Sequence, residues 1–444
     1  DLFTLYVALE LLTFAGVPLV CLDGGGDTLR AALRYLLFAL VGSMLYLLGA
    51  VLLYGAYGTL DIALLGAAVR PGPVTWTVLA LMTCGLLAKT ALFPLHLWLP
   101  PAHAGAPAAA SAVLSALVIK GSWFLVVRLW FDVMPGVVTF SAAQLLGALG
   151  AAAIVAGSVV ALRQQRLKLL VAYSTIAQIG YLFLMFPLAF DIDSGALVQG
   201  VALHGGLLQA VSHATAKASM FMAAGLVYAA LGHDRLADMA GVARAMPVTV
   251  LAFVLAGIAL MGVLPSGAYL AKKLMLDAAV GSGQWWWSIV LQGGAVFTAG
   301  YVVLVLRSVL STGSAEPLCA RAVSRRSEYA ALSLALISLA LAAVTLGPVS
   351  VDLLSGALEP KELLTLLLVL AGGILLMQGL APVALRNSPG STPSGLRSLQ
   401  RAMFSVGVIF EQGDLLLRRW TAASICLLAL AALFGVLLFY GSLT

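Results

Sequence analysis

The 444-residue chain carries little charge. Only 9% of its residues are Asp, Glu, Lys or Arg, against about 25% in an ordinary soluble domain. It is 62% hydrophobic, with a mean hydropathy of +1.06. No polar block is long enough to form a separate soluble domain, whereas apolar runs of the ~20 residues that cross a bilayer recur along the whole length. The composition therefore predicts an integral membrane protein.

Cysteine and cofactor motifs are also scarce. The four cysteines, Cys21, Cys84, Cys319 and Cys426, lack CxxC spacing, which argues against a metal cluster or a disulfide framework. The sequence has no Gly-rich nucleotide loop and no paired histidines clearly set for haem. We therefore expect no cofactor and no metal in this chain, and any reductase activity must come from partner subunits.

Hydropathy predicts an all-α polytopic protein with about twelve transmembrane helices. The runs 248–264 and 266–281 are divided only by Pro265 and Ser266, so we interpret them as one broken helix. The other predicted spans are 2–21, 31–57, 74–93, 109–131, 140–162, 168–190, 199–231, 286–308, 329–348, 363–385 and 420–441. Two polar connections, 309–328 and 386–402, separate the later spans, and the second is rich in Ser, Pro and Gly and is expected to be a flexible link.

The basic residues indicate an orientation. With the start of the chain outside, the predicted loops on one side of the membrane contain 16 of the 24 Lys and Arg residues, and those on the other side contain only Arg70, Arg128 and Lys361. The 16 are Arg30, Arg34, Arg163, Arg166, Lys168, Arg235, Arg244, Arg307, Arg321, Arg325, Arg326, Arg386, Arg397, Arg401, Arg418 and Arg419. The positive-inside rule makes the first face, which we call the basic face, cytoplasmic. The net charge of +6 is thus an orientation signal, and we expect no nucleic-acid partner.

Six charged residues remain inside predicted spans. An isolated charge at the bilayer centre costs about 2.5–3.5 kcal/mol, so such a set indicates a function. Lysines near a helix end can instead extend to the interface, and Lys273 is the clearest case. The others lie deeper; the full set is Glu10, Lys89, Lys120, Lys217, Lys272 and Lys273.

These residue types suit a proton relay. Burial lowers the pKa of a lysine and a nearby carboxylate raises it again, so a Glu–Lys pair that joins and separates can take up and release a proton. His213 and Lys217 are i,i+4 and share a helix face, and His204 lies on the same span. The alternative for each histidine is a buried side chain that is merely hydrogen-bonded.

Two prolines interrupt lysine-bearing spans. Pro94 follows Lys89 by five residues and Pro265 precedes Lys272; proline breaks a helix, and free carbonyls at membrane depth are tolerated only in protein or beside water. We therefore expect water near Lys89. His96 and His103 follow the first break, where the chain is expected to leave the membrane, and they are candidates for the proton entrance.

The motifs LLAKTALFPLHLWLPPAHAGAP, LKLLVAYSTIAQIGYLF, SHATAKASMFMAAG and GVLPSGAYLAKKLML resemble the antiporter-like family. That family contains proton-pumping membrane subunits of respiratory complex I, subunits of Mrp-type cation/proton antiporters and subunits of membrane-bound hydrogenases. The resemblance implies two inverted five-helix repeats, 1–133 and 134–310, followed by C-terminal helices in 311–444. The family's first helices are missing before Glu10, so we expect an incomplete first repeat and an N-terminus further upstream. The resemblance also implies a proton pathway through Glu10, Lys89, Lys120, His213, Lys217 and Lys272.

The function predicted from these features is proton translocation along a buried Glu/Lys/His axis, with Na⁺ exchange left open. The expected partners are other membrane subunits of a hetero-oligomeric complex in the cytoplasmic membrane of a bacterium or archaeon. The chain itself shows no redox or hydrolytic site, so whether it serves an enzyme depends on that complex. The alternatives are a subunit of a bicarbonate-uptake complex and a largely structural scaffold.

Overall fold

A computed structural model describes residues 1–198, 200–311, 321–343, 360–382, 385 and 394–442. In these residues the regular elements are helices, and there is no β-strand. Eleven of the described helical segments are long and apolar enough to cross a membrane, which confirms a multi-pass all-α membrane protein. They are Leu2–Val20 (α1), Gly26–Tyr57 (α2), Pro73–Thr90 (α4), Ala108–Val133 (α6, η1, α7 and η2), Phe140–Arg163 (α8), Leu167–Leu188 (α9), Val201–Leu231 (α10), Trp285–Leu310 (α14), Arg325–Ala343 (α15 and η4), Glu362–Leu380 (in α17, Pro360–Leu380) and Trp420–Gly441 (α19).

Two shorter helices, α12 (Pro247–Leu260) and α13 (Gly267–Gly281), lie in the region predicted as one broken helix. The non-helical stretch between them contains Pro265, as predicted for a broken helix. A second break, containing Pro94, separates α4 from α5 (Leu99–Gly105). The described residues contain eleven candidate spans, and a twelfth crossing formed by α12 and α13 together stays a prediction. The remaining short elements are Ile62–Ala68 (α3), Leu236–Asp238 (η3) and Val242–Ala245 (α11).

Local sequence signals start several of these helices. The side chains of Asp1, Thr139 and Ser266 accept hydrogen bonds from backbone N–H groups in the first turns of α1, α8 and α13. Such caps satisfy donors that a helix start leaves unpaired. Pro73 and Pro247 begin α4 and α12, where a missing N–H costs nothing.

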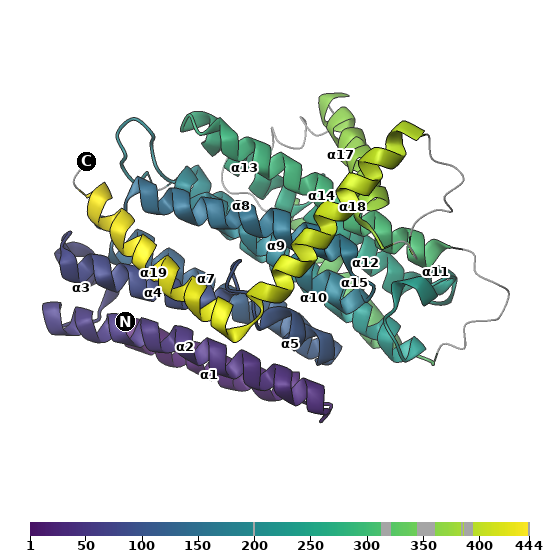
Figure 1. Cartoon of the computed structure of the whole chain (residues 1–444), viewed down its shortest axis with the longest axis horizontal. Coiled ribbons are helices and arrows are strands. Elements are labelled where there is room, and N and C mark those ends of the chain that lie inside the picture. Colours follow the sequence, from purple (N-terminus) through teal and green to yellow (C-terminus); the bar gives the residue numbers. More distant parts are fainter. Residues whose placement is uncertain (199, 312–320, 344–359, 383–384, 386–393, 443–444) are drawn as a thin grey trace.

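Helix α10 lies at the centre of the molecule. It packs against α6, α9, α12, α13 and α15, while α1 and α2 lie side by side along one edge (Figure 1). Large apolar side chains on the outer face of α1, including Phe3, Leu11 and Phe14, are exposed, as expected for a lipid-facing surface. The charged residues predicted inside spans lie on α1 (Glu10), α4 (Lys89), α7 (Lys120), α10 (Lys217) and α13 (Lys272 and Lys273).

Helix α18 (Ser394–Leu417) departs from the sequence-based expectation. We expected 386–402 to be a flexible link, but residues 394–402 belong to this helix; residues 386–393 lie outside the described ones. In Figure 1, α18 crosses the bundle obliquely before the chain turns into α19. Glu411 Oε2 on α18 lies 2.7 Å from Arg163 Nε at the end of α8, and Arg163 Nη1 donates to the Leu380 carbonyl at the end of α17, 3.4 Å away. These contacts place α18 at the basic face of the bundle.

Candidate functional site

Glu10, Ser43 and Lys89 form a buried hydrogen-bonded group between α1, α2 and α4. Lys89 Nζ lies 2.6 Å from both Glu10 Oε1 and Ser43 Oγ, and the Ser43 hydroxyl also donates to Glu10 Oε1. Lys89 is 4% exposed and Glu10 8%. An ion pair so far from water is stable only when additional hydrogen bonds satisfy its atoms. The structure thus brings together the predicted Glu10–Lys89 pair and adds Ser43, which the sequence analysis missed.

A close approach of α2 and α4 makes this group possible. A Cβ on Gly42 would overlap the carbonyl oxygen of Gly85, and a Cβ on Gly85 would overlap that of Gly42. Only glycine on both helices permits this contact between their backbones. Since Ser43 follows Gly42 and Lys89 lies one turn beyond Gly85, the crossing point sets the distance between their side chains.

The first break begins directly after Lys89. Helix α4 ends at Ala91, which has a left-handed backbone (φ 58°), and the chain is irregular as far as Trp98. The Trp98 indole Nε1 donates to the carbonyl of Ala88 over 3.1 Å. One of the carbonyls that we expected to need water is therefore satisfied by a side chain of the protein.

A cluster of basic side chains from α5, α7 and α10 occupies the centre. His103, His213 and Lys217 are 0% exposed, and Lys120 is partly buried. The His103 ring stacks on Phe221 of α10, one turn beyond Lys217, with 4.3 Å between the ring centroids. No ring nitrogen of His103 or His213 has a hydrogen-bond partner among the described residues. His103, which was predicted at the entrance, thus lies with the predicted pathway residues Lys120, His213 and Lys217. The ring nitrogens of the two histidines are available to bind water.

The two lysines of the central cluster are held by neutral acceptors. Lys217 Nζ lies 2.5 Å from Ser174 Oγ and 3.3 Å from the carbonyl oxygen of Val171. Lys120 Nζ donates to the carbonyl of Ser115, which lies in the π-helical turn η1 (Leu114–Val118). The wider turn changes the backbone pairing and leaves that carbonyl available. Among the described residues, no carboxylate forms an ion pair with either lysine.

Lys272 lies beside the second break, on a cavity of about 360 Å³. A cavity of that size holds on the order of ten water molecules. The cavity is lined in part by Glu362 at the start of α17. Glu362 follows Lys361, which the predicted topology places on the face opposite the basic face. A Cβ on Gly262 would lie 3.5 Å from Lys272 Cδ, so the lysine stem rests against the break. The other polar side chains that line the cavity include Lys273, Asp277, Gln292 and Glu362.

Three predicted histidines lie elsewhere than expected. His96 and His103 were placed where the chain leaves the membrane, but they are 2% and 0% exposed; the turn after the break folds back into the protein. His96 Nε2 lies 2.8 Å from Oδ1 of Asp414 on α18, a partner that the sequence analysis missed. His204 is exposed in the first turn of α10, with Nδ1 3.1 Å from the carbonyl oxygen of Gly200, so the structure does not bring it to the buried cluster.

Sequence comparison identifies relatives of the chain. A family model described as NADH:quinone oxidoreductase/Mrp antiporter, transmembrane, matches residues 1–298. NADH-quinone oxidoreductase subunit N of Desulforudis audaxviator is 35% identical over 322 residues, which are 71% of this chain and 62% of the relative. A subunit of the Na⁺/H⁺ antiporter of Bacillus subtilis is 29% identical over 296 residues, or 66% of this chain and 58% of the relative. The chain spans about three fifths of the length of these curated relatives.

Solved structures with similar folds are parts of membrane complexes. A chain of the archaeal membrane-bound sulfane sulfur reductase matches with a TM-score of 0.67 and 27% identity, over 84% of this chain and 72% of that one. A chain of respiratory complex I from Thermus thermophilus gives 0.62 and 27%, over 77% and 72%. A chain of the Mrp complex from Dietzia sp. gives 0.67 over 91% and 76%; at 21% identity it shows the fold alone.

Proposed function

Because the chain belongs to the NADH:quinone oxidoreductase/Mrp antiporter transmembrane family, we propose that it is a proton-translocating subunit of a multi-subunit membrane complex. The observation that carries this proposal is the combination of one buried Glu–Lys pair with a separate, carboxylate-free cluster of buried lysines and histidines. Groups of this kind are expensive inside a membrane and characteristically serve proton transfer. The partners are other membrane subunits, which supply the driving force.

The proposed path runs from the Glu10–Lys89 pair through the central cluster to Lys272. When Glu10 and Lys89 are joined, the carboxylate stabilises the ammonium; when they separate, Lys89 releases its proton toward the cluster. His103 and His213 have free ring nitrogens and can pass protons between Lys120 and Lys217 by way of water. Lys272 would deliver the proton into the cavity that contains Glu362 and Asp277. His204 has no part in this route.

The two inverted repeats, 1–133 and 134–310, with a C-terminal part in 311–444, belong to the same proposal. Their support is a local similarity between the two breaks. In each break a residue with a left-handed backbone, Ala91 or Gly262, lies three positions before a proline, Pro94 or Pro265. The two breaks share this spacing.

Protons fit this axis better than Na⁺. The axis consists chiefly of lysine and histidine nitrogens, which repel a cation when protonated, whereas Na⁺ would require several oxygen ligands. Exchange for Na⁺ elsewhere in the complex is compatible with proton movement through this chain. The basic loops support a location in the cytoplasmic membrane of a bacterium or archaeon, with the basic face inward.

The test is the variant Lys217→Ala in the complete complex, reconstituted in vesicles and assayed with a pH-sensitive dye. Loss of a proton-transfer group typically costs about 10²–10⁴ in rate, so translocation should fall to background while the complex still assembles. Lys273→Ala is the matched control and should translocate normally. Normal translocation by Lys217→Ala would overturn the proposed function.

A further inference from the structure

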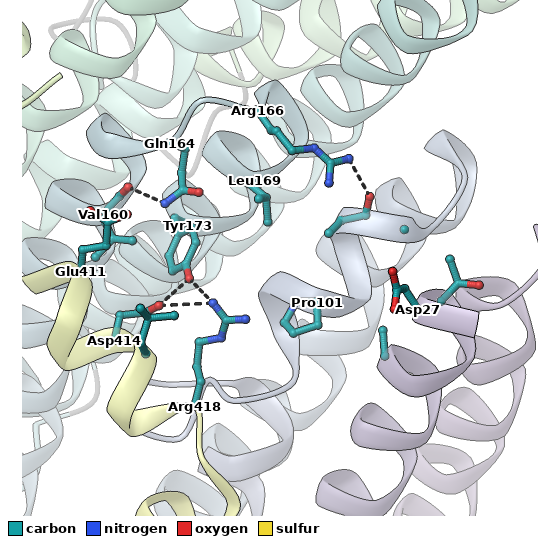
Figure 2. Close-up of a pocket in the computed structure, with 15 residues that line it drawn as sticks. Asp27, Pro101, Val160, Gln164, Arg166, Leu169, Tyr173, Glu411, Asp414 and Arg418 are labelled. Atoms are coloured by element: carbon teal, nitrogen blue, oxygen red, sulfur yellow. Dashed lines mark hydrogen bonds and ion pairs between the residues drawn. The ribbon is translucent and has the colours of Figure 1, made fainter. Parts of the chain in front are cut away.

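A second acid–base group lies on the opposite side of the first break from Lys89. Asp414 of α18 accepts hydrogen bonds at both carboxylate oxygens: His96 Nε2 lies 2.8 Å from Oδ1, and the Tyr173 hydroxyl donates to Oδ2 over 2.6 Å. Arg418 Nη1 donates to the Tyr173 oxygen over 2.8 Å and lies 3.4 Å from Asp414 Oδ2. Figure 2 shows Tyr173, Asp414 and Arg418 converging from α9 and the end of α18. Asp414 is 6% exposed and His96 2%.

Two cavities meet at this group. A cavity of about 390 Å³ lies toward the basic face and is lined by Tyr173, Asp414 and Arg418 (Figure 2). A smaller one of about 170 Å³ is lined by Tyr173 and Asp414 as well, and also by Phe93 and His96. Tyr173 and Asp414 therefore stand between the larger cavity and the histidine. The larger volume corresponds to on the order of ten water molecules. The smaller cavity is lined mostly by apolar side chains, and its polar groups are those of His96, Tyr173 and Asp414.

The charges around Asp414 keep it ionised. Burial raises its pKa, but the hydrogen bond and charge of His96, the Tyr173 hydrogen bond and the charge of Arg418 outweigh burial and hold that pKa below its ordinary value. The remaining charged groups near the pair or along the larger cavity are Asp27 and Arg34 of α2, Arg163 of α8, Arg166 before α9 and Glu411 of α18.

We propose that His96 and Asp414 form a second acid–base pair, which loads protons from the basic face into the axis; this inference rests on the proposed function. It repeats the arrangement of Lys89 and Glu10, in which a carboxylate from a neighbouring helix faces a base next to the break. The two bases flank Pro94 in sequence, so one break carries an inner and an outer pair.

The transfer is balanced in protons and charge. In the proposed resting state, neutral His96 keeps its Nε2 hydrogen and shares it with Asp414 in a hydrogen bond. Its Nδ1 has no partner among the described residues. In the proposed step Nδ1 takes a proton from a hydronium ion, which leaves water and an imidazolium balanced by the Asp414 carboxylate. The imidazolium then returns to the neutral form by passing a proton to water on the inner side, toward Lys89.

The test measures proton translocation by the complete complex in vesicles as a function of pH on the basic face. Asp414→Asn keeps the shape of the side chain and removes its charge. Loss of an opposite charge in contact shifts a titration by about 1–3 pH units. The rate should therefore fall, and its midpoint should move to lower pH by about one unit or more. Asp414→Glu should restore the midpoint.

Glu328→Gln is the control, because it removes a carboxylate that accepts a hydrogen bond from Thr249 and lines neither of the two cavities. It should leave the midpoint unchanged. An unshifted midpoint in Asp414→Asn, at normal or reduced rate, would overturn the inference and reduce Asp414 to a docking contact. If Asp414→Asn keeps its midpoint and Lys217→Ala is inactive in the same assay, only the inference about the entrance fails. Normal activity of Lys217→Ala would overturn the proposed function itself.

Discussion

Both broken helices have a residue with a positive φ three positions before a proline, but the lysines beside the two breaks have different surroundings. At the first break, Lys89 precedes the interruption, is 4% exposed and is bonded to Glu10 and Ser43. At the second, Lys272 follows the interruption and faces a cavity of about 360 Å³. One lysine is held by a carboxylate in a closed site, and the other borders space that water can fill.

Lysines beside helix breaks therefore occupy two kinds of site, a closed site with a paired carboxylate and an open site beside a cavity. The closed site with its paired carboxylate can store a charge until its neighbours move, because separation of the pair is costly in a medium of low dielectric. The open site borders a cavity with polar side chains, where water can reach the lysine. The asymmetry between the breaks would therefore give the axis a direction, from the stored charge at Lys89 to the water beside Lys272.

The largest predicted effect is on stability, at the first break. Lys89→Ala leaves the Glu10 carboxylate buried without its partner, which costs about 3–5 kcal/mol. Lys272 borders a cavity, so Lys272→Ala should lower the free energy of unfolding by no more than about 1 kcal/mol. Thermal unfolding of the detergent-solubilised protein measures both changes.

Addition of Glu10→Gln to Lys89→Ala removes the unpaired charge and should recover part of the lost stability. Equal losses from Lys89→Ala and Lys272→Ala would mean that the two lysines are held alike, against the contrast drawn above.

A smaller effect distinguishes the backbones of the two breaks. Ala91 and Gly262 both have a positive φ (58° and 66°), which costs a residue with a Cβ about 1–2 kcal/mol. Gly262→Ala should therefore destabilise the protein by about that amount, whereas Ala91→Gly should leave it unchanged or slightly more stable. The same unfolding assay applies.

Gly55→Ala is the matched control for the glycine substitution. Gly55 lies in α2 with an ordinary helical backbone and nothing within 4 Å of an added Cβ, so this change should stabilise by up to about 1 kcal/mol. If Gly262→Ala and Gly55→Ala shift unfolding in the same direction, the left-handed backbone at Gly262 does not contribute as described.

Much of this arrangement could be predicted from the sequence. Long apolar runs and prolines determine where spans begin and break, so the helices and both interruptions were found. The charges inside apolar runs identified Glu10 and Lys89 as candidates, and the resemblance to a known family named Glu10 as the partner of Lys89. The structure places the two side chains in contact.

Other parts depend on how helices cross, which hydropathy does not report. Ser43 is one of many small hydroxyl residues, and only the glycine contact between α2 and α4 brings it to Lys89. Asp414 lies in a segment too polar to be recognised as a span, after a Ser/Pro/Gly-rich stretch that suggested a link. A carboxylate within the apolar context VIFEQGDLLL was the available signal for it.

The central claim is that Lys89 acts by losing and regaining a proton. Lys89→Arg tests it directly, because a guanidinium keeps the charge and the bond to Glu10 but stays protonated in proteins. In the complete complex in vesicles, we predict normal assembly with proton translocation reduced about a hundredfold or more. Full translocation by Lys89→Arg would show that a permanent charge suffices at this position and would contradict the account.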